Sequence, residues 1–190
     1  MTAMPEPVQA ASGVTPNGGL GHAQPLTPLT QSDSVSLAND ALWYASHGIP
    51  VFRCWPRAKE PMTTHGFKDA TTSEACIASW WRTRPDANIG IPTGKTSGLL
   101  VVDVDPRNGG DESLEDLVRK YGPLPETAEQ ITGGGGRHLV FRHSGSIGLP
   151  KTLAPGIDLK GDGGYIVVAP SIHPSGRKYD WDGTPVAKLF

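Results

Sequence analysis

The chain has 190 residues, 37% of them hydrophobic and 19% charged, which is the composition of a soluble protein with one domain of ordinary size. Its formal net charge is -2, and residues 35–190 hold 17 basic and 17 acidic side chains, so the composition argues against a module that grips duplex DNA through a strongly basic face. No stretch approaches the ~18 apolar residues of a spanning helix, and the start of the chain lacks the basic and apolar regions of a signal peptide. We therefore expect a cytoplasmic protein with no membrane partner.

The first part of the chain differs in composition from the rest. Residues 1–34 are rich in Pro, Gly, Thr, Ser, Ala and Gln and contain no aromatic side chain. Such a segment buries too little apolar area to offset the entropy lost on ordering. The sequence thus predicts a disordered tail over residues 1–34 and one folded domain over residues 35–190.

Periodicity and turn residues predict the elements of that domain. In chain order they are a helix from Ser36 to a stop at Gly48, a strand over 49–55, a helix that starts at residue 72 or 73, an apolar segment over 88–91 and a strand over 99–105. A helix over 112–121 follows, and then strands over 129–132, 138–142, 157–160, 165–169 and 178–181. Helices early and strands late indicate the α+β class.

The two cysteines form neither a metal pattern nor a disulfide pattern. Cys54 and Cys76 are far apart, and neither belongs to a C-x-x-C pair, the spacing typical of structural zinc sites. We expect two reduced thiols and no zinc.

Two aspartates close the clearest strand, Gly98-Leu-Leu-Val-Val-Asp-Val-Asp105. Residues two apart in a strand point to the same face, so Asp103 and Asp105 should project side by side, with Cα atoms about 6.6 Å apart. Two such carboxylates repel each other unless a cation lies beside them, and hard oxygen ligands favour Mg²⁺ or Mn²⁺. The alternative is that Asp105-Pro106 only begins a turn.

A third carboxylate, Asp158, lies in the β-like segment Gly156-Ile-Asp-Leu-Lys-Gly161. Three carboxylates suit a site with two divalent ions, which stabilise the attacking and the leaving oxygen in phosphoryl transfer. The alternative for Asp158 is a turn acid ahead of the glycines that follow.

Between these acids lies a glycine-rich turn, Thr132-Gly-Gly-Gly-Gly-Arg-His138. Glycine lets a backbone approach a phosphate closely and direct its N–H groups at it. Gly136, Arg137 and His138 are therefore candidate contacts to a nucleotide.

The loop Gly90-Ile-Pro-Thr-Gly-Lys-Thr96 is superficially like a phosphate-binding P-loop. It has three residues between its glycines where that motif has four, and it leads into a strand, not a helix. A P-loop ATPase is not expected.

Taken together, these segments resemble the bifunctional primase-polymerase domain of the archaeo-eukaryotic primase superfamily. The resemblance runs from about Leu37 to Trp181 and rests on four motifs: Gly90-Ile-Pro-Thr-Gly94, Ser97 to Pro106, Gly135-Gly-Arg-His-Leu-Val-Phe141 and Gly156 to Ser171. It implies a modified RNA-recognition-like sheet, mixed or antiparallel, with flanking helices and an added α/β unit.

The resemblance also implies roles. Asp103, Asp105 and Asp158 match the acidic motifs that hold two Mg²⁺ or Mn²⁺ ions, His138 matches the histidine that binds the phosphates of the incoming nucleotide, and Lys160 is a further phosphate contact. The position two before His138, often Ser in the superfamily, is Gly136, so a backbone N–H is expected to replace a side-chain contact.

These roles predict a DNA primase or polymerase that acts by template-directed nucleotidyl transfer, in the replication of a plasmid-like or phage-like element. Its expected partners are nucleoside triphosphates, a single-stranded or primed DNA template, and a replicative helicase or helical accessory domain. Because the sequence ends at Phe190 without such a helical segment, strand extension is expected ahead of strand initiation. Two alternatives remain: a non-catalytic nucleic-acid-binding module and a metal-dependent nucleotide phosphohydrolase.

Overall fold

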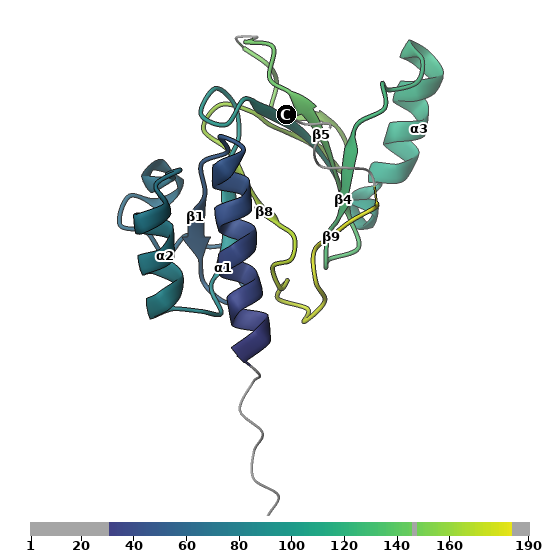
Figure 1. Ribbon diagram of the computed structural model, residues 1–190. Coiled ribbons are helices and arrows are strands. Elements are labelled where there is room, and N and C mark those ends of the chain that lie inside the picture. Colours follow the sequence, from purple (N-terminus) through teal and green to yellow (C-terminus); the bar gives the residue numbers. More distant parts are fainter. Residues whose placement is uncertain (1–30, 146–147, 184–190) are drawn as a thin grey trace, which may run out of the picture.

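The computed structural model describes residues 31–145 and 148–183 and has an α+β architecture with two antiparallel sheets (Figure 1). The described helices are α1 (Gln31–Ser46), α2 (Glu74–Thr83) and α3 (Gly110–Tyr121), with 3-10 turns η1 (Gly66–Asp69) and η2 (Pro106–Asn108). The three-stranded sheet has the order β1 (Phe52–Cys54), β2 (Asn88–Pro92), β8 (Tyr165–Val168). The six-stranded sheet has the order β6 (Thr152–Ala154), β7 (Ile157–Lys160), β3 (Leu99–Val104), β5 (Arg137–Arg142), β4 (Ala128–Ile131), β9 (Asp180–Trp181). The predicted fold class is confirmed.

The sequence predicted the start of helix α2 correctly and the start of helix α1 too late. Helix α2 begins after Ser73, whose side chain accepts a hydrogen bond from the backbone of Cys76, as the capping pattern predicts. Helix α1 begins at Gln31, five residues before the predicted start at Ser36. The prediction missed these residues because segment 31–35, Gln-Ser-Asp-Ser-Val, has a single apolar residue and therefore no apolar period. Residues 1–30 of the predicted tail lie outside the described residues.

One core cluster joins the helices α1 and α2 to both sheets. It combines apolar positions of α1, α2, β2 and β8 with positions of the six-stranded sheet, and its fully buried members include Ala41, Ile77, Ile89, Val101 and Val140. The predicted helix face, Leu37, Ala41, Tyr44 and Ala45, is buried in this cluster. The two sheets therefore share a core.

Helix α3 covers the opposite face of the six-stranded sheet (Figure 1). There Val102, Val104 and Ile157 of β3 and β7 pack with Leu114 and Leu117 of α3. Strand residues alternate between faces, so the residues between these positions, Asp103 and Asp158 among them, point to the face away from α3.

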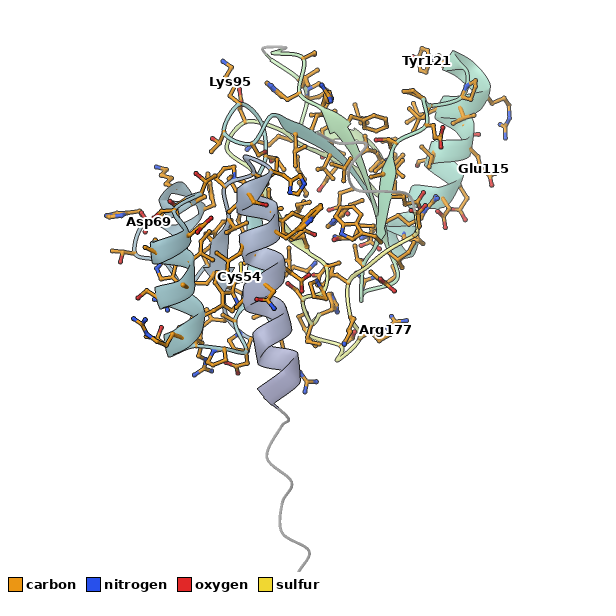
Figure 2. All side chains as sticks on the ribbon, in the orientation of Figure 1. Cys54, Asp69, Lys95, Glu115, Tyr121 and Arg177 are labelled. Carbon is orange, nitrogen blue, oxygen red and sulfur yellow. The ribbon has the colours of Figure 1, made fainter. Side chains whose placement is uncertain are left out.

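The surface carries a mixture of polar and apolar side chains. Figure 2 shows Lys95 and Tyr121 at the periphery, and Tyr121 at the end of α3 is 73% exposed. None of the described helices is both long enough and apolar enough to cross a membrane.

Candidate active site

Three of the predicted site residues lie in one row across the six-stranded sheet. Asp103 of the central strand β3 pairs with His138 of β5 on one side and with Asp158 of β7 on the other. Directly paired residues of antiparallel strands have side chains close together on one face. His138 lies 35 positions and Asp158 lies 55 positions after Asp103 in the sequence, and strand pairing brings the three residues together.

A tight backbone contact fixes the register that brings Asp158 to this row. The N–H of Asp105 donates to the carbonyl of Gly156 at 2.8 Å, directly before β7 begins. Gly156 has a positive φ of 69°, and a Cβ there would lie 2.7 Å from the carbonyl oxygen of Asp105 and 2.8 Å from that of Asn108. Only glycine allows β7 to start this close to the end of β3.

Asp103, Asp105 and Asp158 all border one cavity of about 280 Å³. Asp105 lies just beyond β3, in extended backbone, and caps η2. Its carboxylate accepts hydrogen bonds from Asn108 Nδ2 at 2.8 Å and from Arg107 Nε at 3.1 Å. The Arg107 guanidinium lowers the pKa of Asp105 below its ordinary value, so this carboxylate is ionised at neutral pH.

Lys160 lies between two of the carboxylates. Its ammonium group is 3.0 Å from Asp158 Oδ2 and 3.5 Å from Asp103 Oδ2. This contact, with a hydrogen bond from Thr152, lowers the pKa of Asp158. Burial alone would lower the pKa of Lys160, but Asp158 and Asp103 together raise it above its ordinary value. The carboxylates thus already attract a cation.

His138 is buried, and its ring is oriented by Gln130 of the neighbouring strand β4. The amide of Gln130 accepts from the N–H of Ala169 at 2.7 Å, and its NH₂ group donates to the carbonyl of Val167 at 3.0 Å and to His138 Nδ1 at 2.9 Å. Because Nδ1 accepts, the ring proton lies on Nε2. That nitrogen faces the cavity, 3.6 Å from Asp103 Oδ1.

The environment of His138 keeps its imidazole neutral at physiological pH. Burial lowers its pKa to about 4, although the nearby Asp103 acts in the opposite direction. His138 is therefore a neutral donor through Nε2, suited to a hydrogen bond to an anionic oxygen rather than to an ion pair.

The glycine-rich turn lies beside the cavity, but the backbone N–H of Gly136 does not point into the cavity as predicted. Gly136 lines the cavity, yet its N–H donates to Thr132 Oγ1 at 3.0 Å within the turn. A Cβ on Gly136 would lie 2.6 Å from the carbonyl oxygen of Val104, which explains why this chain has no serine there. The prediction of a backbone contact from Gly136 to phosphate is not supported by this geometry.

Arg137 lies away from the cavity. It directly precedes His138 in β5, so it points to the other face of the sheet. There it forms ion pairs with Asp111 of α3 at 3.0 Å and with Glu129 of β4 at 3.3 Å. The predicted nucleotide contact by Arg137 is therefore wrong in placement, and this residue instead links β5 to α3.

The structure brings to the cavity basic residues to which the sequence assigned no role. Lys59, Arg107 and His173 border the same cavity as the three acids. Burial lowers the pKa of His173, and the positive charges of Lys59, Arg107 and Arg177 lower it further. These three residues lie far apart along the chain, so the sequence did not indicate that they border one cavity.

The donor set matches the chemistry of a divalent metal, although its present arrangement does not form a complete ligand cluster. Across residues 31–145 and 148–183, no three His, Cys, Asp or Glu side chains are placed to share one ion. Asp105 is held by Arg107, and Asp158 is held by Lys160. Carboxylate oxygens suit Mg²⁺ or Mn²⁺, so the ion would bind by displacing these cationic side chains.

A family of known proteins matches most of the chain. The family model for the N-terminal domain of bifunctional DNA primase/polymerases matches residues 41–189, a range that contains every residue of the site. No curated protein matches the chain. The chain therefore belongs to the bifunctional DNA primase/polymerase N-terminal domain family.

Proposed function

We propose that the chain catalyses template-directed nucleotidyl transfer, adding nucleotides from nucleoside triphosphates to a DNA strand during replication. The observation that carries this proposal is the row Asp158, Asp103 and His138, which places two carboxylates next to a neutral imidazole donor on one face of the sheet. Family membership supports DNA and nucleotides as the substrates.

In the proposed reaction, a bond forms between a strand 3′ oxygen and the α-phosphorus of the nucleotide. The bond from that phosphorus to the bridging oxygen breaks, pyrophosphate leaves and the hydroxyl proton passes to water. His138 Nε2 donates to a phosphate oxygen and orients the triphosphate. Lys59 and His173 border the same cavity and place positive charge and hydrogen-bond donors where the leaving pyrophosphate gathers negative charge.

Asp103, Asp105 and Asp158 are the residues that would hold divalent ions. When bound, two Mg²⁺ or Mn²⁺ ions supply charge stabilisation to the attacking and the leaving oxygen. Lys160, which now neutralises Asp103 and Asp158, would be released from them and become free to contact a phosphate.

Incorporation of labelled nucleotide on a primed template, with Mg²⁺ or Mn²⁺, tests the proposal. Asp103→Asn is expected to lower incorporation by at least about 10³-fold, because it removes the central carboxylate of the row. Asp116→Asn on exposed α3 is the matched control and is expected to leave the rate unchanged. Retained activity in Asp103→Asn, with the fold intact by circular dichroism, contradicts the assignment.

Measurements of binding and of phosphate release separate the two alternatives. A non-catalytic module would bind single strands in a salt-sensitive way, without any effect of metal on triphosphate binding. A phosphohydrolase would release phosphate from nucleotides in the absence of a template.

A further inference from the structure

A buried tyrosine, Tyr179, has a hydroxyl group without a hydrogen-bond partner among residues 31–145 and 148–183. Its side chain is only 2% exposed. A buried hydroxyl is normally paired, because an unpaired one has lost its hydrogen bonds to water and gained none in the protein. Tyr179 therefore indicates a place where a bound molecule supplies the missing partner.

The segment after β8 holds the Tyr179 ring in one position. The backbone N–H of Tyr179 donates to the carbonyl of Ser171 at 2.9 Å, and the ring packs with Phe52 of β1 and Val167 of β8. The hydroxyl is thus carried on a rigid support, which is what a precise contact to a ligand requires.

The hydroxyl of Tyr179 lies near the row of Asp103 and His138. The ring centres of Tyr179 and His138 are 6.5 Å apart. Burial raises the pKa of the hydroxyl well above its ordinary value, and the negative charge of Asp103 raises it further. The group therefore remains protonated at neutral pH and can both donate and accept a hydrogen bond.

Tyr179 borders a cavity of about 330 Å³ that adjoins the cavity of the three acids. The two cavities meet at Lys59, Asp103 and His138, which border both of them. The volume lies within the range of ~300–1,000 Å³ usual for small-molecule sites. A molecule with its reacting atoms beside Asp103 can therefore extend into both cavities.

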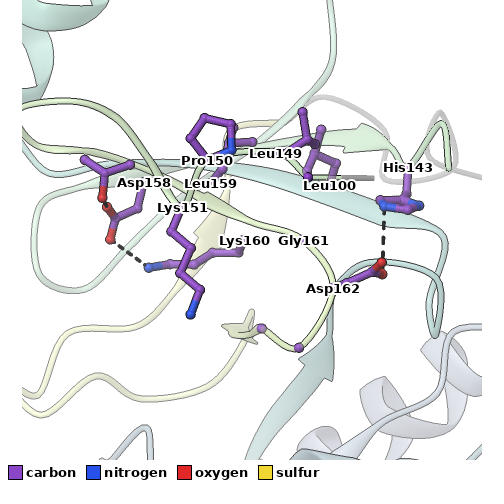
Figure 3. Close-up of a pocket in the computed structure, with 14 residues that line it drawn as sticks. Leu100, His143, Leu149, Pro150, Lys151, Asp158, Leu159, Lys160, Gly161 and Asp162 are labelled. Carbon is purple, nitrogen blue, oxygen red and sulfur yellow. Dashed lines mark hydrogen bonds and ion pairs between the residues drawn. The ribbon is translucent and has the colours of Figure 1, made fainter. Parts of the chain in front are cut away.

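The two cavities differ in charge. Beyond the shared residues, the cavity of the three acids has Arg107 and His173, which suit the triphosphate. Among the described residues, the cavity of Tyr179 has Lys160 as its one further charged side chain. Figure 3 shows the Lys160 ammonium held by the carboxylate of Asp158, at 3.0 Å. The less charged cavity thus suits the uncharged part of a nucleotide.

We propose that the cavity of Tyr179 binds the sugar of the incoming nucleoside triphosphate, and that the Tyr179 hydroxyl forms a hydrogen bond with a hydroxyl group of that sugar. The proposal rests on the function proposed above, because it assigns a further contact to the substrate of that reaction. Hereafter we call this space the sugar cavity.

The requirements of templated synthesis favour the sugar over the base as the partner of Tyr179. A fixed hydroxyl that bound a base edge would discriminate among the four bases, whereas a template must be free to select any of them. The sugar is common to all four nucleotides. A contact to it therefore orients every substrate and selects only the kind of sugar.

The other walls of the sugar cavity are more weakly polar. Ile166 and Val167 of β8 are buried and apolar, and Gly163 and Gly164 offer only backbone. Tyr165 also borders the cavity, but it is only half-buried, so its hydroxyl depends less on a partner inside the site. Tyr179 is thus the group that can distinguish sugars with and without a given hydroxyl.

Binding of three nucleotides that differ only in the sugar tests the proposal. Adenosine triphosphate, its 2′-deoxy form and its 2′,3′-dideoxy form are titrated calorimetrically in Mg²⁺ without DNA. The unmodified protein is expected to bind the form that lacks the contacted hydroxyl about tenfold more weakly, because the tyrosine hydroxyl is then left unpaired. Tyr179→Phe should abolish this difference, because it removes the hydroxyl and keeps the ring.

Tyr121→Phe is the matched control. It makes the same chemical change on α3, where Tyr121 is 73% exposed and borders neither cavity, so the tenfold difference should persist. Because the Tyr179 hydroxyl has no partner in the described residues, Tyr179→Phe should unfold at the same temperature as the unmodified protein when no nucleotide is present.

The three nucleotides also identify the hydroxyl that is bound. Weaker binding of both deoxy forms assigns the 2′-hydroxyl and a preference for ribonucleotides, and weaker binding of the dideoxy form alone assigns the 3′-hydroxyl. Equal binding of all three to the unmodified protein overturns the proposal. So does a difference that persists in Tyr179→Phe, or an equal loss of affinity for all three in that variant.

Incorporation on a primed template separates this proposal from the proposed function. Tyr179→Phe is expected to raise KM about tenfold for nucleotides with the contacted hydroxyl and to leave kcat within about twofold, because the hydroxyl does not touch the reacting atoms. A fall in kcat with unchanged KM would contradict a sugar contact. Absence of incorporation by the unmodified chain would instead contradict nucleotidyl transfer, and the binding measurement does not depend on it.

Discussion

A buried amide, Gln130, determines which nitrogen of His138 faces the cavity that Asp103, Asp105 and Asp158 border. It accepts from Ala169, so its NH₂ group is turned toward Val167 and His138. The neutral imidazole therefore presents Nε2–H to the cavity that the three acids border. Gln130, which does not line that cavity, thus belongs to the proposed triphosphate site because it orients His138.

Gln130→Glu tests this dependence. A carboxylate at this position accepts from Nδ1, so the ring proton should move to Nδ1 and the pKa of His138 should rise. The ¹⁵N chemical shifts of the imidazole report the proton position directly, and KM for the nucleotide should rise about tenfold with a smaller change in kcat. Unaltered ¹⁵N shifts would show that another group orients the ring.

The pKa of His138 also makes stability depend on pH. Burial lowers it from 6.5 to about 4, so between these values the unfolded chain binds a proton that the folded chain does not. The free energy of unfolding is therefore highest above about pH 6.5 and falls as the pH is lowered toward 4, by up to about 3 kcal/mol. Urea titrations in chelator should show a smaller fall for His138→Asn, and equal falls would contradict the burial effect.

The sequence predicted some of these residues and missed others for physical reasons. Asp103, Asp158 and His138 could be found because each lies in a strand-like segment that resembles a family motif. Gln130 and His173 could not, because their roles arise from pairing between distant segments. Arg137 was misplaced because strand alternation, which predicts where Asp103 and Asp105 point, also turns Arg137 away from His138.

The turn between β4 and β5 is closed by contacts that leave no room for a side chain at Gly136. A Cβ there would meet the carbonyl of Val104 at 2.6 Å. The turn also uses Thr132 as its internal acceptor. The glycine is thus required by the approach of β3 to this turn.

Gly136→Ser is accordingly expected to destabilise the fold by about 1–3 kcal/mol, the usual cost of forcing atoms into a packed space. It should also weaken nucleotide binding, because the turn borders the cavity. Thermal unfolding with and without nucleotide measures both effects. A variant as stable as the unmodified chain, with tighter nucleotide binding, would show that the turn can accommodate a serine.

The sequence predicted most helices and strands, and the predictions failed where an element is short or polar. The strands β3, β5 and β7 lie within one residue of their predicted bounds. Strand β6 was missed because its three residues, Thr152–Ala154, lie between Pro150 and Pro155 and show no alternation. Strand β1 is only three residues long, Phe52–Cys54, within the longer apolar run predicted.

At the scale of the whole molecule, Tyr44 links three distant parts of the fold. Its hydroxyl donates to the carbonyl of Ala169, just after β8, at 3.0 Å and accepts from Trp181 Nε1 of β9 at 3.0 Å. Burial raises the pKa of this hydroxyl well above its ordinary value. Helix α1 is thereby connected to the strands of both sheets. Periodicity could not predict that two sheets would share one core, because it does not specify which strands pair.

Tyr44→Phe removes both hydrogen bonds and leaves buried partners unsatisfied, so it should lower the free energy of unfolding by about 1–3 kcal/mol. Because the core is shared, urea unfolding should remain a single transition by fluorescence and circular dichroism. Two separate transitions would show that the sheets are independent units.

We propose that the row Asp158, Asp103 and His138 transfers nucleotides to a DNA strand. The most direct test measures pyrophosphate release and nucleotide incorporation together on a primed single-stranded template with Mg²⁺ or Mn²⁺. We expect one pyrophosphate for each nucleotide incorporated, dependence on the template base, and loss of both signals in Asp103→Asn. Release of inorganic phosphate from nucleotides without template or incorporation would contradict nucleotidyl transfer.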